Sequence, residues 1–321
     1  MKFNKINEFK EICKMSQMQL KAWLAKWLSK YYGDVVNEDG FLYAKGTDPI
    51  LLTAHMDTVH KRQCKKISVK KRDGKTILSS KDGIGGDDRC GIYMILQIIK
   101  ETNLRPYVLF CEDEEIGGVG SKKFCITDYV DDLCDCLFFI ELDRANDHDL
   151  VYYDDANELF HDFCSDTTGY KESYGSFSDI SNLSPACGVS SVNISCGYYN
   201  AHTTDEYVVF EEMEKSIEAT IALMKEGIAW GDRYEYKEYE YHVSSFERKW
   251  YESLYGSYED DLDKEDKEDA RDSNLVHYQF EDVNGNVYDE VECEGFYEAV
   301  GKLMLHNPDI RWNDIADYES Y

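Results

Sequence analysis

The chain has 321 residues, of which 43% are hydrophobic, so it is long enough to bury a substantial core. Its formal net charge of −29, from 64 acidic and 35 basic side chains, argues against binding to nucleic acid phosphates or to anionic membranes. No apolar run approaches the roughly 20 residues of a transmembrane helix, and the N-terminus lacks the apolar core of a signal peptide. We therefore expect a soluble, cytoplasmic protein that binds neither nucleic acid nor a membrane.

The chain has eleven cysteines, an odd number, and most of them lie inside apolar runs. In a reducing compartment such cysteines are free, mostly buried thiols. The one close pair, Cys134 and Cys136, has no second pair to complete a ligand set, so it is weak evidence for a metal site.

The first predicted helix begins near residue 17. Ser16 and Gln19 form an S-x-x-Q capping box, and the apolar residues that follow keep helical spacing until Gly33. Two hairpins and one buried strand are predicted after this helix. The hairpin turns fall at Asp39-Gly40 and Asp73-Gly74, and the buried strand covers residues 50–54.

Strands and helices then alternate along the chain. Alternation of this length predicts a mixed, mostly parallel sheet that is covered by helices on both faces, which is a three-layer α/β/α sandwich. The predicted strands cover residues 107–111, 137–142 and 189–195, and the predicted helices cover 90–100 and 208–225.

The composition changes after about Gly231. Residues 231–272 are rich in Tyr, Glu and Asp, which predicts a solvated helix or an acidic linker. An Asn284-Gly285 hairpin and a helix over 296–305 are predicted beyond it. We therefore divide the chain into a catalytic domain (1–230), an acidic segment (231–272) and a small α+β accessory subdomain (273–321).

Acids and histidines follow the ends of several predicted strands. His55 comes directly after the strand LLTA, with Asp57 two residues further on. A neutral imidazole is a good zinc ligand, and a nearby carboxylate can hold its second nitrogen. A buried histidine beside a structural acid would have the same pattern, so this motif alone decides nothing.

Two acidic motifs lie further along the chain. Asp87 and Asp88 stand among glycines at the start of a predicted helix, where they could bridge two cations or simply cap the helix. Glu114 and Glu115 follow a strand within CEDEE. Adjacent side chains at a strand end point to opposite faces, so one could bind metal while the other acts as a general base. A polar loop is the alternative for this motif.

The last two motifs are ELD and NAH. Asp143 ends the apolar strand FFIELD, with Glu141 as a weaker rival for a ligand role, and His202 precedes the last long helix. Ligands in open α/β sheets bind beyond the carboxyl ends of the strands. Together the motifs supply two histidines and three acids, which fit two metal ions when one carboxylate bridges them.

The ordered motifs HMD, GGDDRCG, EDEEIGGVG, ELD and NAH resemble those of the co-catalytic dinuclear zinc exopeptidases. That superfamily includes peptidase T, glutamate carboxypeptidases, aminoacylases and single-domain zinc aminopeptidases. The resemblance covers about Phe9 to Lys225. It implies two divalent ions per chain, with zinc expected and cobalt or manganese as alternatives.

The resemblance also implies a role for each matching residue. His55 and Asp143 would complete one metal site, Glu115 and His202 would complete the other, and Asp87 would bridge them. Glu114 would be the general base toward a metal-bridging water, and Asp57 would orient His55. A cis peptide bond between Asp87 and Asp88 is a further implication of the resemblance.

The chain departs from many relatives because it lacks room for a lid. Only 31 residues separate His55 from Asp87, and 58 separate Asp143 from His202, so neither gap holds a further domain. No lid or dimerisation domain is evident, although oligomers remain possible, and the chain looks closer to the lidless single-domain aminopeptidases. Candidate substrate contacts are Asp179, Tyr199, Asn200 and Arg144. For Arg144, the alternative is a structural salt bridge.

Three functions follow from these observations. The first is an exopeptidase acting on peptides, with aminopeptidase as the leading form. The second is an amidohydrolase that removes acyl groups from N-acyl amino acids with the same site. The third, of another class, is a catalytically inactive binding protein on the same fold.

Overall fold

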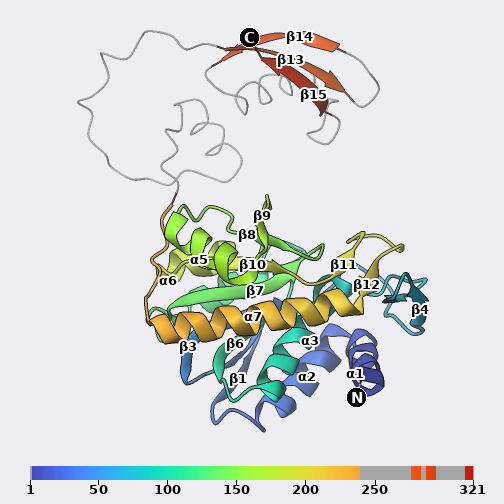
Figure 1. The fold of residues 1–321 in the computed structure, drawn as a ribbon, viewed down its shortest axis with the longest axis vertical. Helices are drawn as coiled ribbons and strands as arrows, with labels where there is room; N and C mark the ends of the chain where they lie inside the picture. Colours follow the sequence, from blue (N-terminus) through green and yellow to red (C-terminus); the bar gives the residue numbers. More distant parts are fainter. Residues whose placement is uncertain (1, 239–275, 283–286, 294–314, 321) are drawn as a thin grey trace. The chain divides into compact units, whose positions relative to one another are not determined.

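The computed structural model describes residues 2–238, 276–282, 287–293 and 315–320 (Figure 1). The chain divides into two compact units, Met1–Tyr239 and Glu240–Tyr321, each of which is considered by itself. The predicted division at 230 and 272 stays a prediction.

The first unit is organised around an eight-stranded sheet in the order β1-β2-β6-β3-β7-β10-β8-β9. Its four central strands, β6, β3, β7 and β10, are mutually parallel, while β1, β2 and β8 are antiparallel to their neighbours toward the centre. The predicted mixed, mostly parallel sheet is confirmed. The strands are β1 (Val35–Glu38), β2 (Phe41–Ala44), β3 (Asp48–His55), β6 (Pro106–Cys111), β7 (Phe138–Arg144), β8 (Asp149–Val151), β9 (Lys171–Glu172) and β10 (Ser191–Ser195).

Alternating side chains of these strands form two separate hydrophobic cores. On β2, Leu42 and Ala44 belong to one core, and Phe41 and Tyr43 belong to the other. Such alternation follows from the two-residue repeat of a strand. The sheet is therefore apolar on both faces, and each face requires a cover of helices.

Helices cover both faces, so the predicted three-layer α/β/α sandwich is confirmed. One core includes buried residues of five helices, of which α7 is the longest (Figure 1). The other core includes residues of two α-helices and a 3₁₀ helix. The first group is α1 (Lys2–Cys13), α2 (Gln17–Leu28), α3 (Gly86–Glu101), α5 (Glu158–Thr168) and α7 (Phe210–Trp230), and the second is α4 (Val119–Cys125), η1 (Asp128–Leu133) and α6 (Ile180–Cys187).

The capping box of α2 forms as predicted. The hydroxyl of Ser16 accepts a hydrogen bond from the backbone N–H of Gln19 at 3.3 Å, and the Gln19 side chain accepts one from Ser16 N–H at 3.1 Å. The preceding helix α1 was not predicted, although Ile6, Phe9 and Ile12 recur within it at helical spacing. A tertiary contact stabilises it, since the ring of Phe9 packs edge-on against Tyr93 of α3 at 5.4 Å.

A second, four-stranded sheet in the first unit has the order β11-β12-β5-β4. The predicted second hairpin is confirmed as β4 (Ser68–Arg72) paired with β5 (Lys75–Ser79). The strands β11 (Tyr198–Tyr199) and β12 (Tyr207–Val209) were not predicted, since each is too short for a visible alternation. They flank the loop that carries His202, so this sheet positions one of the candidate ligands.

The second unit contains a three-stranded sheet in the order β14-β13-β15. The antiparallel pair β13 (Val276–Asp282) and β14 (Val287–Cys293) matches the strands predicted on either side of the Asn284-Gly285 hairpin turn, over 276–280 and 287–293. Strand β15 (Ile315–Ser320) was not predicted. The predicted Asn284-Gly285 turn, the helix over 296–305 and the acidic tract over 239–272 lie outside the described residues.

Two expectations from composition concern the described residues. The ten cysteines within residues 2–238 are all free, and most are buried, as expected. No helix in the described part of the chain is long and apolar enough to cross a membrane.

Gly91 of α3 provides a test of the packing between this helix and the sheet. A Cβ atom there would lie 1.8 Å from the carbonyl oxygen of Leu142 and 2.6 Å from Asp88 Oδ1. We expect Gly91→Ala to lower the free energy of unfolding by roughly 3 kcal/mol, because the added methyl group would overlap its neighbours. At a helix position with free space, the same substitution would raise the free energy of unfolding by about 1 kcal/mol. Urea unfolding followed by circular dichroism measures this.

The matched control is Gly33→Ala, because a Cβ at Gly33 would meet nothing within 4 Å. Its urea midpoint should stay close to that of the parent chain. Equal midpoints for the two variants would contradict the close approach of α3 to β7.

Candidate metal centre

The predicted site residues converge at the carboxyl ends of the parallel strands. His55 is the last residue of β3, Asp143 lies near the end of β7, and Glu114 and Glu115 follow β6. Asp87 lies in the first turn of α3, and His202 lies in the loop between β11 and β12. Five segments that are far apart in the sequence thus contribute to one cluster.

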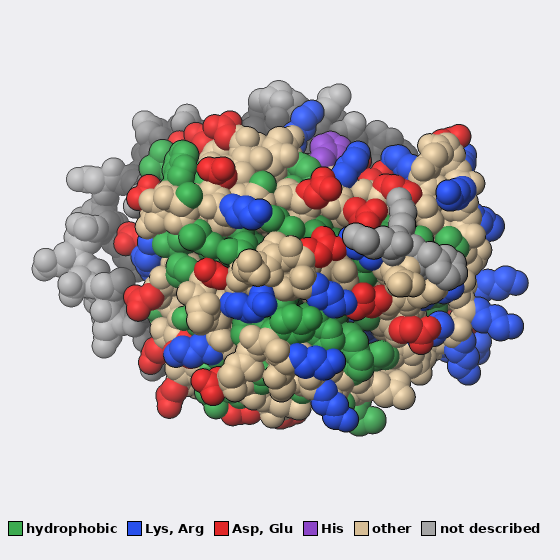
Figure 2. All heavy atoms as spheres, turned by 60° about the horizontal axis from the view of Figure 1, so that its bottom comes forward, with side chains coloured by type: hydrophobic (Ala, Val, Ile, Leu, Met, Phe, Trp, Pro, Cys, Tyr) green, Lys and Arg blue, Asp and Glu red, His purple; other side chains and the backbone are tan. Residues whose placement is uncertain are grey.

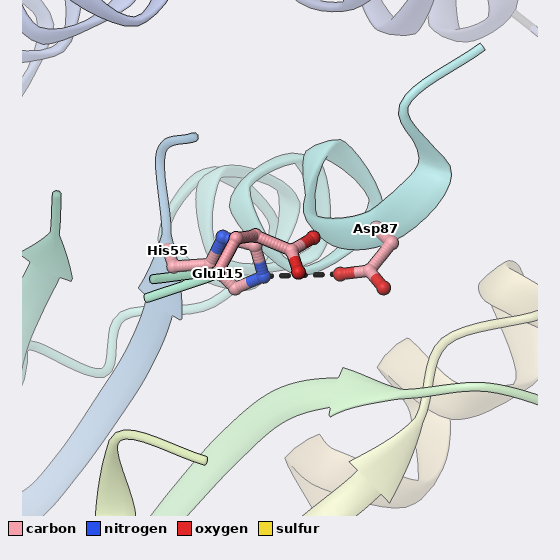
Figure 3. Close-up of side chains that lie close together, drawn as sticks. All are labelled: His55, Asp87 and Glu115. Carbon is pink, nitrogen blue, oxygen red and sulfur yellow. Dashed lines mark hydrogen bonds and ion pairs between the residues drawn. The ribbon is translucent and has the colours of Figure 1, made fainter. Parts of the chain in front are cut away.

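The carboxylate of Asp87 lies between the two histidines. Its Oδ1 is 3.0 Å from His55 Nε2, and its Oδ2 is 3.2 Å from His202 Nε2. Figure 3 shows His55, Asp87 and Glu115 pointing toward one another. Since each oxygen faces a different imidazole, this carboxylate has the geometry that a bridging ligand requires.

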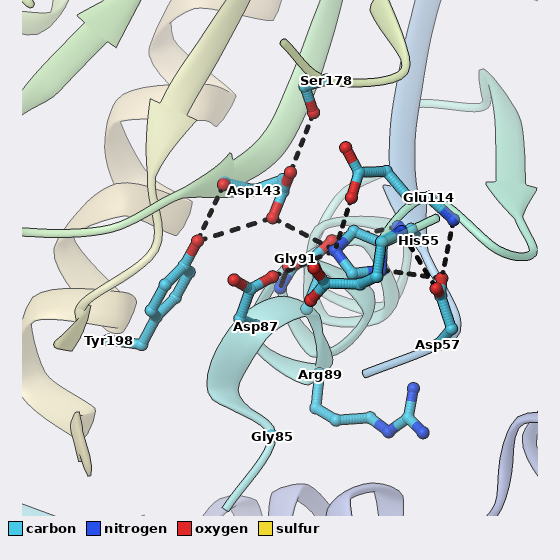
Figure 4. A network of polar contacts seen from close by, with 12 residues as sticks. His55, Asp57, Gly85, Asp87, Arg89, Gly91, Glu114, Asp143, Ser178 and Tyr198 are labelled. Atoms are coloured by element: carbon cyan, nitrogen blue, oxygen red, sulfur yellow. Dashed lines mark hydrogen bonds and ion pairs between the residues drawn. The ribbon is translucent and has the colours of Figure 1, made fainter. Parts of the chain in front are cut away.

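On the His55 side of Asp87, the neighbouring acid is Asp143. Asp143 Oδ1 lies 3.4 Å from His55 Nε2, and its Oδ2 accepts a hydrogen bond from the Ser178 hydroxyl at 2.8 Å. The hydroxyl of Tyr198 donates to the backbone carbonyl of Asp143 at 2.9 Å (Figure 4). These contacts fix the orientation of the carboxylate toward the histidine.

On the His202 side, the neighbouring acid is Glu115. Glu115 Oε2 lies 3.1 Å from His202 Nε2, while its buried Oε1 makes no hydrogen bond with the described residues. The side chain of His202 is 57% exposed, whereas that of His55 is 1% exposed. The His202 side of the cluster therefore opens toward solvent, and the His55 side is enclosed.

Asp57 lies behind His55 and connects it to the loop after β6. Its Oδ1 is 3.1 Å from His55 Nδ1, and its carboxylate accepts hydrogen bonds from the backbone N–H groups of Glu114 at 3.0 Å and Glu115 at 3.1 Å. With Nδ1 engaged in this way, Nε2 is the nitrogen that faces the cluster. The contacts agree with the orienting role that the resemblance implies for Asp57.

Glu114 points its carboxylate toward the cluster but does not form a hydrogen bond with the cluster residues. Its Oε2 is 4.0 Å from His55 Nε2 (Figure 4), and the carboxylate makes no hydrogen bond within the described part of the chain. Burial, reinforced by the charge of Asp143, raises the pKa of Glu114 to about 9. The carboxyl is therefore protonated at neutral pH in the metal-free chain, and cations bound beside it would lower its pKa so that it could accept a proton.

The electrostatics of the cluster favour a bound cation. Burial and the charge of Asp87 raise the pKa of Glu115 to about 7 and that of Asp143 to about 6. The hydrogen bond with Asp87 raises the pKa of His202 to about 9. Clustered, buried carboxylates repel one another, and a divalent ion removes that cost.

The donor atoms fit a divalent metal ion. Two groups of residues each bring three possible ligand atoms within 4.8 Å of one another. One group is His55, Asp87 and Glu115, and the other is His55, Asp88 and Asp143. Imidazole nitrogen and carboxylate oxygen are ligands that zinc accepts. The second group contains Asp88, which the sequence analysis did not assign as a ligand.

Asp88 is fully buried and lies close to His55 and Asp143. Its carboxylate accepts hydrogen bonds from the backbone N–H of His55 at 3.1 Å and from that of Gly91 at 2.9 Å. The peptide bond between Asp87 and Asp88 is cis, as the resemblance implied. Asp88 therefore ties the end of β3 to the start of α3.

Glu206 is a supporting residue that the sequence analysis missed. Its buried carboxylate accepts hydrogen bonds from the backbone N–H groups of Gly85 at 2.7 Å and Asp87 at 2.9 Å, and lies 2.9 Å from His60 Nε2. Glu206 lies four residues after His202 in the segment NAHTTDE. A side chain that accepts hydrogen bonds from distant backbone N–H groups leaves no recognisable pattern in a sequence. It fixes the loop that presents Asp87.

The four candidate substrate residues lie outside the network around Asp87. Arg144 binds Asp149 Oδ2 through Nε and Nη2, both at 3.2 Å, which is the salt bridge given as its alternative. Tyr199 donates to Glu212 at 2.7 Å, and Asn200 donates to the carbonyl of Asp205 at 3.4 Å. Asp179 is fully buried at the start of α6, and its carboxylate oxygens make no hydrogen bond within the described residues. Their roles toward a substrate remain predictions.

Glu141, the rival to Asp143, is also fully buried. Its Oε2 lies 3.5 Å from the backbone nitrogen of Ile180, and its Oε1 makes no hydrogen bond within the described residues. Unlike Asp143, it makes no contact with either histidine of the cluster in the described structure.

The fold is shared with solved peptidase structures, although neither a protein-family model nor a curated protein matches the sequence. The aminopeptidase PepT of Bacillus cereus ATCC 10987 matches with 17% identity and a TM-score of 0.53, over 70% of this chain and 98% of that chain. A tripeptidase from Staphylococcus aureus subsp. aureus mu50 matches with 13% identity and a TM-score of 0.53, over the same shares.

An aminopeptidase named TET, from the marine sediment archaeon Thaumarchaeota archaeon SCGC AB-539-E09, is similar in the same way. It has 12% identity and a TM-score of 0.54, over 71% of this chain and 98% of that chain. At such identities the similarity concerns the fold. It confirms that the chain has the fold of the exopeptidases that its motifs resemble.

The ionisable cluster predicts that the metal-free protein loses stability as the pH rises. Burial raises the pKa of Glu114 to about 9, so its ionisation between the unfolded value and that pKa opposes folding. The hydrogen bond with Asp87 raises the pKa of His202 from 6.5 to about 9. Protonated His202 therefore stabilises the fold, and this contribution is lost as the pH rises from 6.5 to about 9. The Tm of chelator-treated protein should therefore fall between about pH 5 and pH 9.

Zinc should reverse this trend, because its ligands bind in their deprotonated forms. Differential scanning fluorimetry across the pH range, with chelator or with zinc, measures both effects. A metal-free Tm that stays constant or rises with pH would contradict the described electrostatics.

Proposed function

We propose that this chain is a metal-dependent hydrolase that cleaves peptide bonds as an exopeptidase, with aminopeptidase activity as its leading form. The observation that carries this proposal is the carboxylate of Asp87, whose two oxygens face His55 at 3.0 Å and His202 at 3.2 Å. A structural ion pair needs only one such contact. A carboxylate placed between two imidazoles, with a further acid beside each of them, suits a pair of metal ions.

The proposal assigns each metal ion its residues. His55 and Asp143 would hold one ion, Glu115 and His202 would hold the other, and Asp87 would contact both. Zinc suits this set of nitrogen and oxygen donors, and cobalt or manganese are alternatives.

The proposal gives different chemical roles to different residues of the site. When bound, two divalent ions would polarise the scissile carbonyl and lower the pKa of a water molecule. Glu114 would accept the proton of that water and return it to the leaving amine. Asp57 would keep the imidazole of His55 in the orientation that leaves Nε2 facing the cluster.

The similar structures support a peptidase over a binding protein, because several of them are aminopeptidases and one is a tripeptidase. An N-acyl amino acid deacylase with the same site is the second candidate, and an inactive binding protein is the third. A cytoplasmic location belongs to the proposal as well.

Self-association is compatible with the proposal. One protein of similar structure, the TET1 peptidase of Pyrococcus horikoshii, can assemble into a tetrahedron or a large octahedral shell. Light scattering on the full chain would determine whether this protein assembles.

Variants of Asp87 and Glu114 test the metal site and the general base separately. We expect Asp87→Ala to lose the bound metal, as measured by elemental analysis after zinc reconstitution and gel filtration. Glu114→Gln should keep about two zinc ions per chain and lower kcat by roughly 100- to 10,000-fold, because only the proton acceptor is removed. Activity is measured on a panel of free-amine peptides and a panel of N-acyl amino acids.

Asp113→Asn is the matched control for these variants. Its carboxylate accepts a hydrogen bond from Gln17 rather than facing the cluster, and its backbone has a positive φ that Asn adopts readily. It should keep both metal and activity. Well-folded protein that binds no zinc, or a Glu114→Gln variant with full activity, would refute the proposed mechanism.

A further inference from the structure

A basic segment interrupts this strongly acidic chain. Residues 61–81 contain nine Lys or Arg side chains and one acidic side chain, whereas the whole chain carries a net charge of −29. The segment includes β4 and β5, and Lys and Arg gather at the right edge of Figure 2, the edge where Figure 1 draws β4. Such a local reversal of charge concentrates anions at one place on a surface that otherwise repels them.

The basic segment forms one side of a groove of about 1500 Å³. The registers of the four-stranded sheet place Ser68 opposite Ser79, Lys70 opposite Ile77, and Tyr207 opposite Ser79, so one face of the sheet forms the floor. The aromatic ring of Tyr207 is stacked on that of Tyr199 at 5.1 Å. The floor is thus partly apolar, and cationic side chains surround it, namely Lys65, Lys66, Lys70, Lys71, Arg72 and Lys81.

These cations are available to a ligand. All five residues of β4 are exposed, and Lys66, Lys70 and Lys81 make no ion pair with any described residue. The acids that line the groove are Asp82, Asp205 and Glu206, and Glu206 is already engaged by backbone N–H groups and His60. The cationic side chains therefore outnumber the acids that could neutralise them from within the groove.

The groove adjoins the candidate metal centre. Thr204, Asp205 and Glu206 line it, and they follow His202 in the same loop. The carboxylate of Glu206 also accepts the backbone N–H of Asp87 at 2.9 Å. A peptide with its scissile bond at the cluster could extend past the exposed side of His202 into this groove.

We propose that this groove binds the part of a peptide substrate that extends away from the cleaved bond, and that it selects peptides with acidic side chains there. Carboxylates of the peptide would pair with Lys66, Lys70 and Lys81, and its apolar groups would lie against Ile77 and Tyr207. This inference rests on the proposed peptidase function for the identity of the ligand. The existence of the groove and its positive charge do not depend on that proposed function.

The first experiment measures binding without turnover. Zinc-loaded Glu114→Gln protein is titrated into Leu-Gly-Glu-Glu-Glu with a fluorescent label at its C-terminus, and into the matching Leu-Gly-Gln-Gln-Gln peptide. Fluorescence anisotropy should give about tenfold tighter binding for the acidic peptide, because three exposed ion pairs contribute modestly and are screened by salt. Raising the salt concentration to about 0.5 M should remove most of this preference.

The second experiment removes the charges. Lys66→Gln, Lys70→Gln and Lys81→Gln, combined in the Glu114→Gln background, should bind the acidic peptide as weakly as the glutamine peptide. The control combines Lys26→Gln, Lys30→Gln and Lys215→Gln, which removes the same charge at positions away from the groove. Equal affinity of the two peptides, or an equal loss in both triple variants, would overturn the proposal.

Two further outcomes are informative. A single-stranded DNA oligonucleotide that displaces the labelled peptide at a lower concentration than unlabelled peptide would make the groove a polyanion site and overturn the peptide assignment. In the active parent chain, the lysine triple variant should raise KM for the acidic peptide and leave kcat unchanged.

The two proposals can fail separately. Preferential binding of the acidic peptide with no hydrolysis of any peptide would refute the peptidase function and keep the groove. Hydrolysis at equal kcat/KM for acidic and amide peptides would keep the peptidase function and refute the groove.

Discussion

The structure depends on the enclosure of several carboxylates beside a buried imidazole at the ends of parallel strands. The side chains of His55 and Asp143 are almost completely removed from water, and the carboxylate of Asp87 contacts both histidines of the cluster. Carboxylates this close repel one another, and burial raises the pKa of Glu114, Glu115 and Asp143. A fold keeps such an arrangement only when cations or hydrogen bonds offset its cost. The cluster is thus an energetic burden to the metal-free chain and an advantage to a metal-bound one.

The surrounding scaffold offsets part of this cost through backbone N–H groups. Asp57 accepts hydrogen bonds from the loop after β6, Asp88 from the end of β3 and the start of α3, and Glu206 from the loop before Asp87. Each of these acids connects two segments that carry proposed ligands. The positions of the ligands are therefore coupled, and a change in one supporting acid would move more than one of them.

The hairpin of β4 and β5 differs in charge from the rest of the chain. Acidic side chains predominate over the chain, while the hairpin of β4 and β5 presents a row of Lys and Arg beside the loop of His202. The edge position of β4 keeps these side chains in solvent, where they also protect an unpaired strand edge. The same hairpin thus serves the solubility of the sheet and, in our proposal, the selection of a substrate.

The sequence by itself determined the layered α/β fold, because its apolar runs have the lengths and alternation of buried strands and amphipathic helices. It also predicted that His55, Glu114 and Asp143 would approach one another, since the ends of parallel strands meet at one edge. The resemblance of the motifs added Asp87, Glu115 and His202 to this set. Only the tertiary structure decided which acids support the site. Glu206 and Asp88 accept hydrogen bonds from backbone N–H groups of the site. Arg144 forms a salt bridge with Asp149, which was the alternative to a substrate contact. Strands β11 and β12 likewise depend on contacts between distant segments, and such short strands leave no periodic pattern in a sequence.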